Sequence, residues 1–174
     1  MINQYISDGI WILTGSIIVG SIIYSIILGI LWITNIASDI FKIRQNISEA
    51  MLVIYIITIF KITGIVGIKF YFFDVMNGMY NINLIPFKDA SIIMIVLNFL
   101  LFLPYGVLLP CVFKKLRINP KKVLLIGFIT SFSIELLQLF GGRFTEIDDI
   151  LANSLGTVAG FIIFSYATRI IFKK

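Results

Sequence analysis

Side chains able to do acid–base chemistry gather in one stretch of a chain that is otherwise strongly apolar. Ser131, Glu135 and Gln138 follow the spacing i, i+4, i+7, which places them on one face of a helix. A carboxylic acid held among apolar side chains can give or take a proton. Ionisable groups at membrane depth are costly, so this stretch is where a function is expected.

A second polar group follows within a few residues. Arg143 could meet an anionic group or stabilise developing negative charge, and either Asp148 or Asp149 could act as a second carboxylate beside Glu135. We therefore take Glu135, Arg143 and Asp149 as the catalytic candidates. The ligand-binding candidates are Asn98, Gln138, Asn153, Asp148 and Lys61.

The composition indicates an integral membrane protein. Of 174 residues, 59% are hydrophobic and 13% are charged, far from the soluble average of about 25% charged. The chain has no His and a single cysteine, Cys111, which excludes a Cys/His zinc site and a Ser-His-Asp triad. Adjacent aspartates on a helix diverge, so Asp148 and Asp149 are not expected to hold a divalent cation together. We expect no metal site and no cofactor.

Five segments are apolar enough and long enough to cross a bilayer, since a span needs roughly 20 residues. They cover residues 10–36, 50–68, 92–113, 123–140 and 150–172. The sequence therefore predicts an all-α bundle of about five transmembrane helices in a single membrane domain, residues 1–174.

The basic residues between these segments predict the orientation. Most of the 14 Lys and Arg residues follow the first, third and fifth segments, and few occupy the other side. By the positive-inside rule, the N-terminus lies outside and the C-terminus lies in the cytoplasm. We read the positive charge as a topology signal and expect no nucleic-acid partner.

In this topology the polar candidates from several helices fall in the outer half of the membrane. Lys61 is expected at nearly the depth of Glu135, and the two could form a buried ion pair or share a proton. Alternatively, Lys61 extends to the outer headgroups and Glu135 is simply protonated. The whole polar set could also do no more than hold helices together through hydrogen bonds.

Small residues recur at four-residue intervals in two segments and predict close helix contacts. They are Ser21, Ser25 and Gly29 in the first segment and Gly156 and Gly160 in the last. The sequence does not decide whether these residues make contacts within the chain or between copies of the chain in an oligomer. The aromatic loop of residues 69–91 is expected at the outer membrane interface, where it could hold a short interfacial helix. Residues 83–87, which include Pro86, are expected to form an extended segment in this loop.

Several motifs resemble the VanZ-like family of bacterial membrane proteins. They are Asn83-Leu84-Ile85-Pro86-Phe87, Asn98 through Pro104-Tyr105-Gly106, Ser131 through Gln138, Arg143, and Asp148 through Gly160. The resemblance covers residues 83–160, and Asn98, Glu135, Gln138, Arg143, Asp149, Asn153 and Gly156 fall on its polar motif positions. It implies a multi-pass protein of the bacterial cytoplasmic membrane, associated with low-level resistance to the lipoglycopeptide teicoplanin.

Three functions remain open from the sequence. The first is an envelope protein that binds the drug, or a lipid-linked cell-wall precursor, at a polar site in the outer leaflet. The second is a membrane enzyme that modifies a lipid-linked envelope substrate with Glu135 as acid or base. The third is a non-catalytic helix-packing partner of a larger membrane complex.

Overall fold

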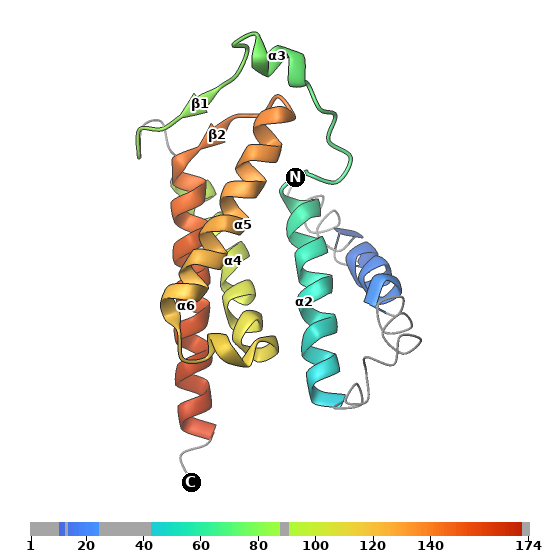
Figure 1. The fold of residues 1–174 in the computed structure, drawn as a ribbon, viewed down its shortest axis with the longest axis vertical. Coiled ribbons are helices and arrows are strands. Elements are labelled where there is room, and N and C mark those ends of the chain that lie inside the picture. Colours follow the sequence, from blue (N-terminus) through green and yellow to red (C-terminus); the bar gives the residue numbers. More distant parts are fainter. Residues whose placement is uncertain (1–10, 13, 25–42, 88–90, 172–174) are drawn as a thin grey trace. The chain divides into compact units, whose positions relative to one another are not determined.

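The computed structural model describes residues 11–12, 14–24, 43–87 and 91–171 (Figure 1). They fall into two compact units, residues 1–63 and 64–174. Three helices of the second unit are long and apolar enough to cross a membrane, namely Ile92–Val112, Pro120–Phe140 and Ile147–Ile170. These ranges agree closely with the expected spans at 92–113, 123–140 and 150–172. The chain is thus a helical membrane protein.

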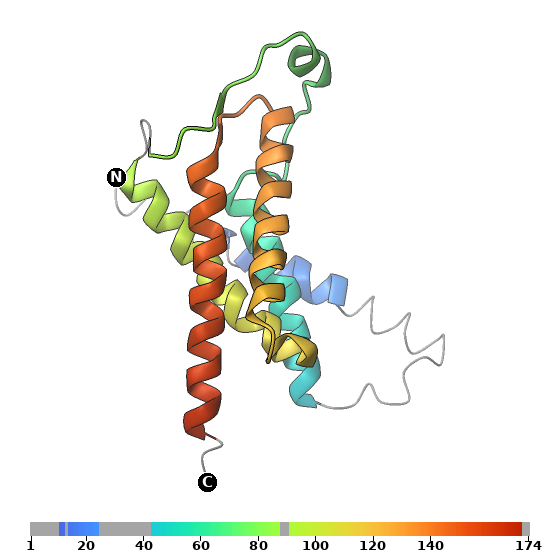
Figure 2. The same ribbon diagram turned by 60° about the vertical axis from the view of Figure 1, so that its left-hand side comes forward.

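Helix α6 (Ile147–Ile171) is the central element of the second unit, because it packs along both α4 (Ile92–Val112) and α5 (Pro120–Phe140). Figure 2 shows α4 crossing α6. At Gly156 and Gly160 the α6 backbone lies directly against the Phe99 and Leu103 carbonyl groups of α4, and a Cβ atom at either glycine would overlap them. Gly156 and Gly160 therefore make a helix contact within the chain. An oligomer through the same residues stays a prediction.

Both ends of the turn between α4 and α5 are closed by side chains. The Arg117 guanidinium donates from Nε to the Pro110 carbonyl at 2.9 Å and from Nη2 to the Cys111 carbonyl at 3.3 Å, which satisfies carbonyls at the C-terminus of α4. The Asn119 side chain accepts from the Lys122 N–H at 3.1 Å and caps α5, whose first residue is Pro120. The 3-10 turn η1 (Lys114–Leu116) lies between them.

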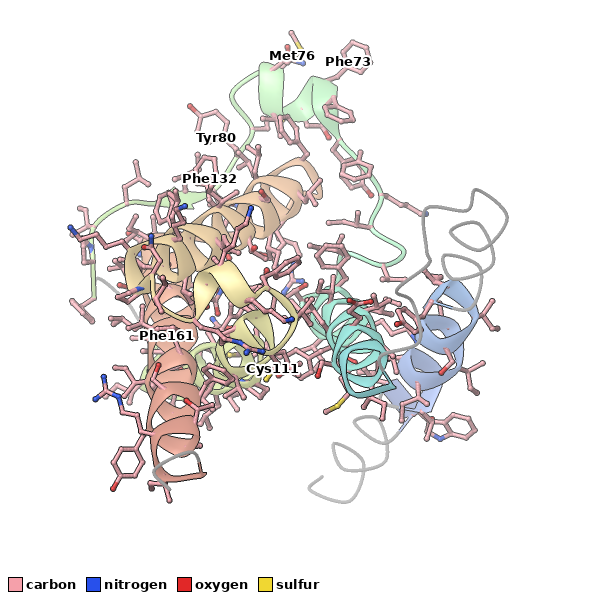
Figure 3. All side chains as sticks on the ribbon, turned by 60° about the horizontal axis from the view of Figure 1, so that its bottom comes forward. Phe73, Met76, Tyr80, Cys111, Phe132 and Phe161 are labelled. Carbon is pink, nitrogen blue, oxygen red and sulfur yellow. The ribbon has the colours of Figure 1, made fainter. Side chains whose placement is uncertain are left out.

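The opposite end of the second unit carries the short elements. Helix α3 (Phe72–Met76) is a short helix within the aromatic loop, as expected. Strand β1 (Ile82–Asn83) pairs in parallel with β2 (Thr145–Glu146), with Ile82 opposite Thr145 and Asn83 opposite Glu146. The strand pair is a small addition to the predicted all-α fold. Phe73 and Met76 project away from the ribbon in Figure 3, and each is 82% exposed.

The first unit contains the helical segment Thr14–Tyr24 and helix α2 (Ile43–Ile62). Gly20 packs against the backbone of Ile54, and the Tyr24 hydroxyl donates to Glu49 Oε2 at 3.3 Å. The small-residue contact of this unit is therefore made at Gly20. Ser21 is exposed, and Ser25 and Gly29 lie outside the described residues.

Helix α2 differs in extent from the expected span at 50–68. It begins at Ile43 and ends at Ile62. Gly64 and Gly67 follow with φ angles of 73° and 86°, a left-handed conformation that ends a right-handed helix. Of the expected first span, 10–36, the structure describes residues 11–12 and 14–24.

The close crossing of α4 and α6 predicts that Gly160→Ala destabilises the protein by about 1–3 kcal/mol, because the added methyl group forces the two backbones apart. Leu155→Ala on the same helix is the control, since Leu155 is 59% exposed and its loss leaves the crossing intact. Thermal unfolding of the purified protein in detergent measures both. Equal losses in the two variants would contradict the assigned role of Gly160.

Candidate functional site

The polar face predicted for α5 is buried in the second unit. Ser131, Glu135 and Gln138 are all buried, while their neighbours Phe132 and Leu136 are exposed. The i, i+4, i+7 spacing thus places them on the helix face that packs inside the unit.

One side-chain hydrogen bond ties this face to α6. The Asn153 amide donates from Nδ2 to Ser131 Oγ at 2.9 Å, and both residues are buried. The Asn153 backbone carbonyl accepts from the Thr157 hydroxyl at 2.9 Å. On the adjoining α5 surface, Gly127 packs against the Thr157 side chain. Asn153 therefore lies at the contact between α5 and α6.

A second hydrogen bond ties α6 to α4, one turn closer to the α6 N-terminus. The Asn98 side chain donates to the Asp149 carboxylate, and both residues are half-buried. Asp149 also lies within electrostatic range of Glu135 on α5. Arg143 interacts electrostatically with both carboxylates. The three helices thus bring Asn98, Glu135, Asp149 and Asn153 into one polar cluster.

The turn after α5 positions Arg143 at the rim of this cluster. The Arg143 N–H donates to the Gln138 carbonyl at 3.0 Å, and the Gly142 N–H donates to the Leu139 carbonyl at 3.0 Å. Gly142 has a φ of 71°, so the turn is a Schellman motif with glycine in the left-handed position. It directs the chain sharply back past α5. The Arg143 side chain is exposed.

The returning chain closes over Glu135. Glu135 Oε2 accepts from the Glu146 N–H at 3.2 Å, and the Thr145 hydroxyl donates to the Glu135 backbone carbonyl at 3.2 Å. Strand β2 thus holds the Glu135 carboxylate and, through its pairing with β1, connects it to the loop at residues 82–87. Thr145 and Glu146 carry no motif of their own. Only their position between Arg143 and Asp148 pointed to the site.

Asp148 has a different environment from Asp149. Both Asp148 carboxylate oxygens accept from the Phe87 N–H, at 3.0 and 3.1 Å, and Asp148 is 3% exposed. Phe87 has a φ of 62°, a conformation costly for a non-glycine residue. Asp148 therefore holds the loop after β1, and the adjacent aspartates diverge as the sequence predicted. Its proposed ligand contact stays a prediction.

Lys61, the remaining ligand-binding candidate, belongs to the first unit. Its ammonium group lies beside Gly15 there. An ion pair with Glu135 stays a prediction.

The arrangement suits ligand binding and proton transfer. Within the described ranges, no three His, Cys, Asp or Glu residues are grouped so that they could hold a metal ion. The cluster instead offers two neighbouring carboxylates, two amides and one guanidinium at the rim. Such a set can hydrogen-bond a polar headgroup and exchange a proton with it.

The sequence of the chain matches the model of a known family. The sequence model of the family described as VanZ/LLP1 matches residues 21–172. The chain belongs to the VanZ/LLP1 family. The family match extends beyond the motif region at 83–160 and takes in most of the first unit.

A named relative supports the assignment. Protein VanZ of Enterococcus faecium is 24% identical to this chain over 126 residues, which cover 71% of this chain and 76% of that protein. No solved structure matches the chain.

The Asp148–Phe87 contact predicts that Asp148→Ala destabilises the outer loop. The Phe87 N–H would lose its acceptor, at a cost of about 1–3 kcal/mol for a buried donor. Hydrogen exchange measured by mass spectrometry should show faster exchange in peptides covering residues 82–87. Asp74→Ala, at an exposed site on α3, is the control. Unchanged exchange in Asp148→Ala would refute the contact.

Proposed function

We propose that this protein acts in the envelope of a bacterium and lowers its susceptibility to teicoplanin-type lipoglycopeptides. Its polar cluster would bind the drug or a lipid-linked cell-wall precursor. Membership of the VanZ/LLP1 family and the likeness to Protein VanZ support this proposal. The observation that carries it is the meeting of Asn98, Glu135, Asp149 and Asn153 from three apolar helices at one end of the unit.

The roles of the side chains follow from their exposure. Arg143 is exposed at the rim and would meet an anionic group of the ligand. Asn98, Gln138 and Asn153 would supply hydrogen bonds deeper in the cluster. Hydrogen bonding between helices alone would not require the exposed Arg143 guanidinium beside the carboxylates of Glu135 and Asp149.

The neighbouring carboxylates favour a second function, a membrane enzyme acting on a lipid-linked substrate. Glu135 and Asp149 interact with each other and with Arg143. Glu135 would act as the acid or base, Asp149 as the second carboxylate, and Arg143 would stabilise negative charge in the transition state.

We further propose the topology that places this cluster at the outer leaflet of the cytoplasmic membrane. It has five spans, with the N-terminus outside and the C-terminus inside. The supporting observation is that α3, β1 and β2 lie at the end opposite the basic turn of Lys114, Lys115 and Arg117 (Figure 1).

The binding site predicts which variants lose the phenotype. A strain lacking the gene would be complemented with the wild type, Glu135→Gln, Arg143→Ala or Asn153→Ala, at membrane levels matched by blotting. The wild type should raise the minimum inhibitory concentration of teicoplanin but not that of a glycopeptide without a lipid tail. Loss of a charge-assisted hydrogen bond at Arg143 should weaken ligand binding roughly tenfold or more and remove most of that rise.

Two matched variants serve as controls. Glu49→Gln makes the same change in the first unit, where Glu49 accepts from Tyr24, and Arg117→Ala removes a guanidinium at the opposite end of α4. Both should retain the phenotype at matched levels. If the wild type raises the minimum inhibitory concentration of neither drug, the resistance proposal is wrong.

The topology predicts which positions a membrane-impermeant maleimide can reach in intact cells. In a Cys111→Ser background, Asp74→Cys on α3 should be labelled and Lys115→Cys in η1 should not, although both sites are exposed in the structure. Both should react after the cells are lysed. If only Lys115→Cys were labelled in intact cells, the orientation would be opposite to the one proposed.

A further inference from the structure

One oxygen atom in the polar cluster lacks a hydrogen-bond partner. Asn153 is 2% exposed, and its Oδ1 has no partner among the described residues, although Nδ2 of the same amide donates to Ser131. Buried polar atoms in native proteins are nearly always hydrogen-bonded, so an orphaned acceptor suggests a group that the protein binds.

Two carboxylates lie one helical turn away from the residues of this hydrogen bond. On α5, Glu135 lies one turn from Ser131, and on α6, Asp149 lies one turn from Asn153. Three donors of the cluster already have acceptors: Asn98 donates to Asp149, the Glu146 N–H donates to Glu135, and Asn153 Nδ2 donates to Ser131. A donor or a cation supplied by a ligand would therefore complete the hydrogen bonding of the Asn153 oxygen.

The charged groups near Asn153 also favour a cationic ligand. Glu135 and Asp149 repel each other between apolar helices, and Asp149 also experiences Glu146 and Asp148. The cationic side chain that interacts with both Glu135 and Asp149 is Arg143, which is exposed at the rim. Two carboxylates in a poorly hydrated site are relieved either by protonation of one of them or by a bound counter-charge.

We propose that a compact monovalent cation binds between α5 and α6. Its ligands are Asn153 Oδ1, Ser131 Oγ and the carboxylates of Glu135 and Asp149. A calcium ion usually takes about six to eight oxygen ligands, and no group of three or more His, Cys, Asp or Glu residues that could supply them exists within the described ranges. Sodium and the primary ammonium group of a lipid or ligand both meet this requirement, because each accepts several oxygen neighbours and brings no acceptor.

The cation site involves the residues of the proposed function but does not depend on it. Occupancy can be measured on the purified protein without any drug, whereas the resistance proposal is tested in cells. If the protein confers no resistance, the cation-binding measurement can still be interpreted. If no cation binds, the resistance measurement can still be interpreted.

The test is the thermal stability of the purified protein in detergent, in chloride salts at equal ionic strength. Sodium, ammonium and ethanolammonium would be compared with N-methyl-D-glucamine, which is too bulky to enter. For the wild type we expect a rise in Tm of about 3 °C or more with at least one compact cation, because a ligand that binds only the folded state stabilises it.

Variants locate the effect. Asn153→Ala and Ser131→Ala should lose the cation-dependent rise, and Asn153→Asp should retain it because a carboxylate oxygen replaces the amide oxygen. Asn119→Ala is the matched control. It removes the cap of α5 at the opposite end of the helix, so it should lower Tm in every salt equally and keep the cation-dependent rise.

Each outcome decides the proposal. A rise with sodium alone assigns the site to an alkali ion, and a rise with ammonium and ethanolammonium alone assigns it to a ligand's amine. A rise with all three supports a compact cation of either source. Equal Tm in all four salts would overturn the proposal, as would a rise that persists in both Asn153→Ala and Ser131→Ala.

Discussion

The backbone contact between α4 and α6 is the constraint on which the second unit depends. Gly156 and Gly160 let α6 lie against carbonyl groups of α4, and Gly106 on α4 lies against the backbone of Thr157 in return. Without side chains between them, the helices come close enough for Asn98 to reach Asp149. In a bilayer, where apolar burial between helices has little driving force, such packing and the hydrogen bonds it permits hold the bundle together.

The polar residues of the site divide into two groups according to what holds them. Asp148, Thr145 and Ser131 are engaged with Phe87, the Glu135 backbone and Asn153, so they fasten loops and helices. Asn153 Oδ1 has no partner among the described residues, and Arg143 is exposed at the rim of the cluster. The hydrogen bonds that fasten the helices and loops thus also orient the polar groups of the cluster.

The loop of residues 64–87 belongs to the same network. The Tyr71 N–H donates to the Phe140 carbonyl at 2.7 Å, the Thr145 N–H donates to the Asn81 carbonyl at 3.0 Å, and Asp148 holds Phe87. Its exposed aromatic and methionine side chains include Phe73 and Met76. Such side chains are typical of a membrane–water interface. A lipid-tailed ligand approaching the cluster would meet this loop first.

The amino-acid sequence by itself determined the membrane class, the approximate positions of α4, α5 and α6, and the buried face of Ser131, Glu135 and Gln138. These features follow from local hydrophobicity and helical periodicity, which act within a few turns. Only the tertiary structure decided that Asp148 accepts from the Phe87 N–H, that β1 pairs with β2, and that one oxygen of Asn153 has no partner among the described residues. These contacts join residues far apart in the chain, so they depend on how closely the helices cross and on the path of the loops, which no local pattern encodes.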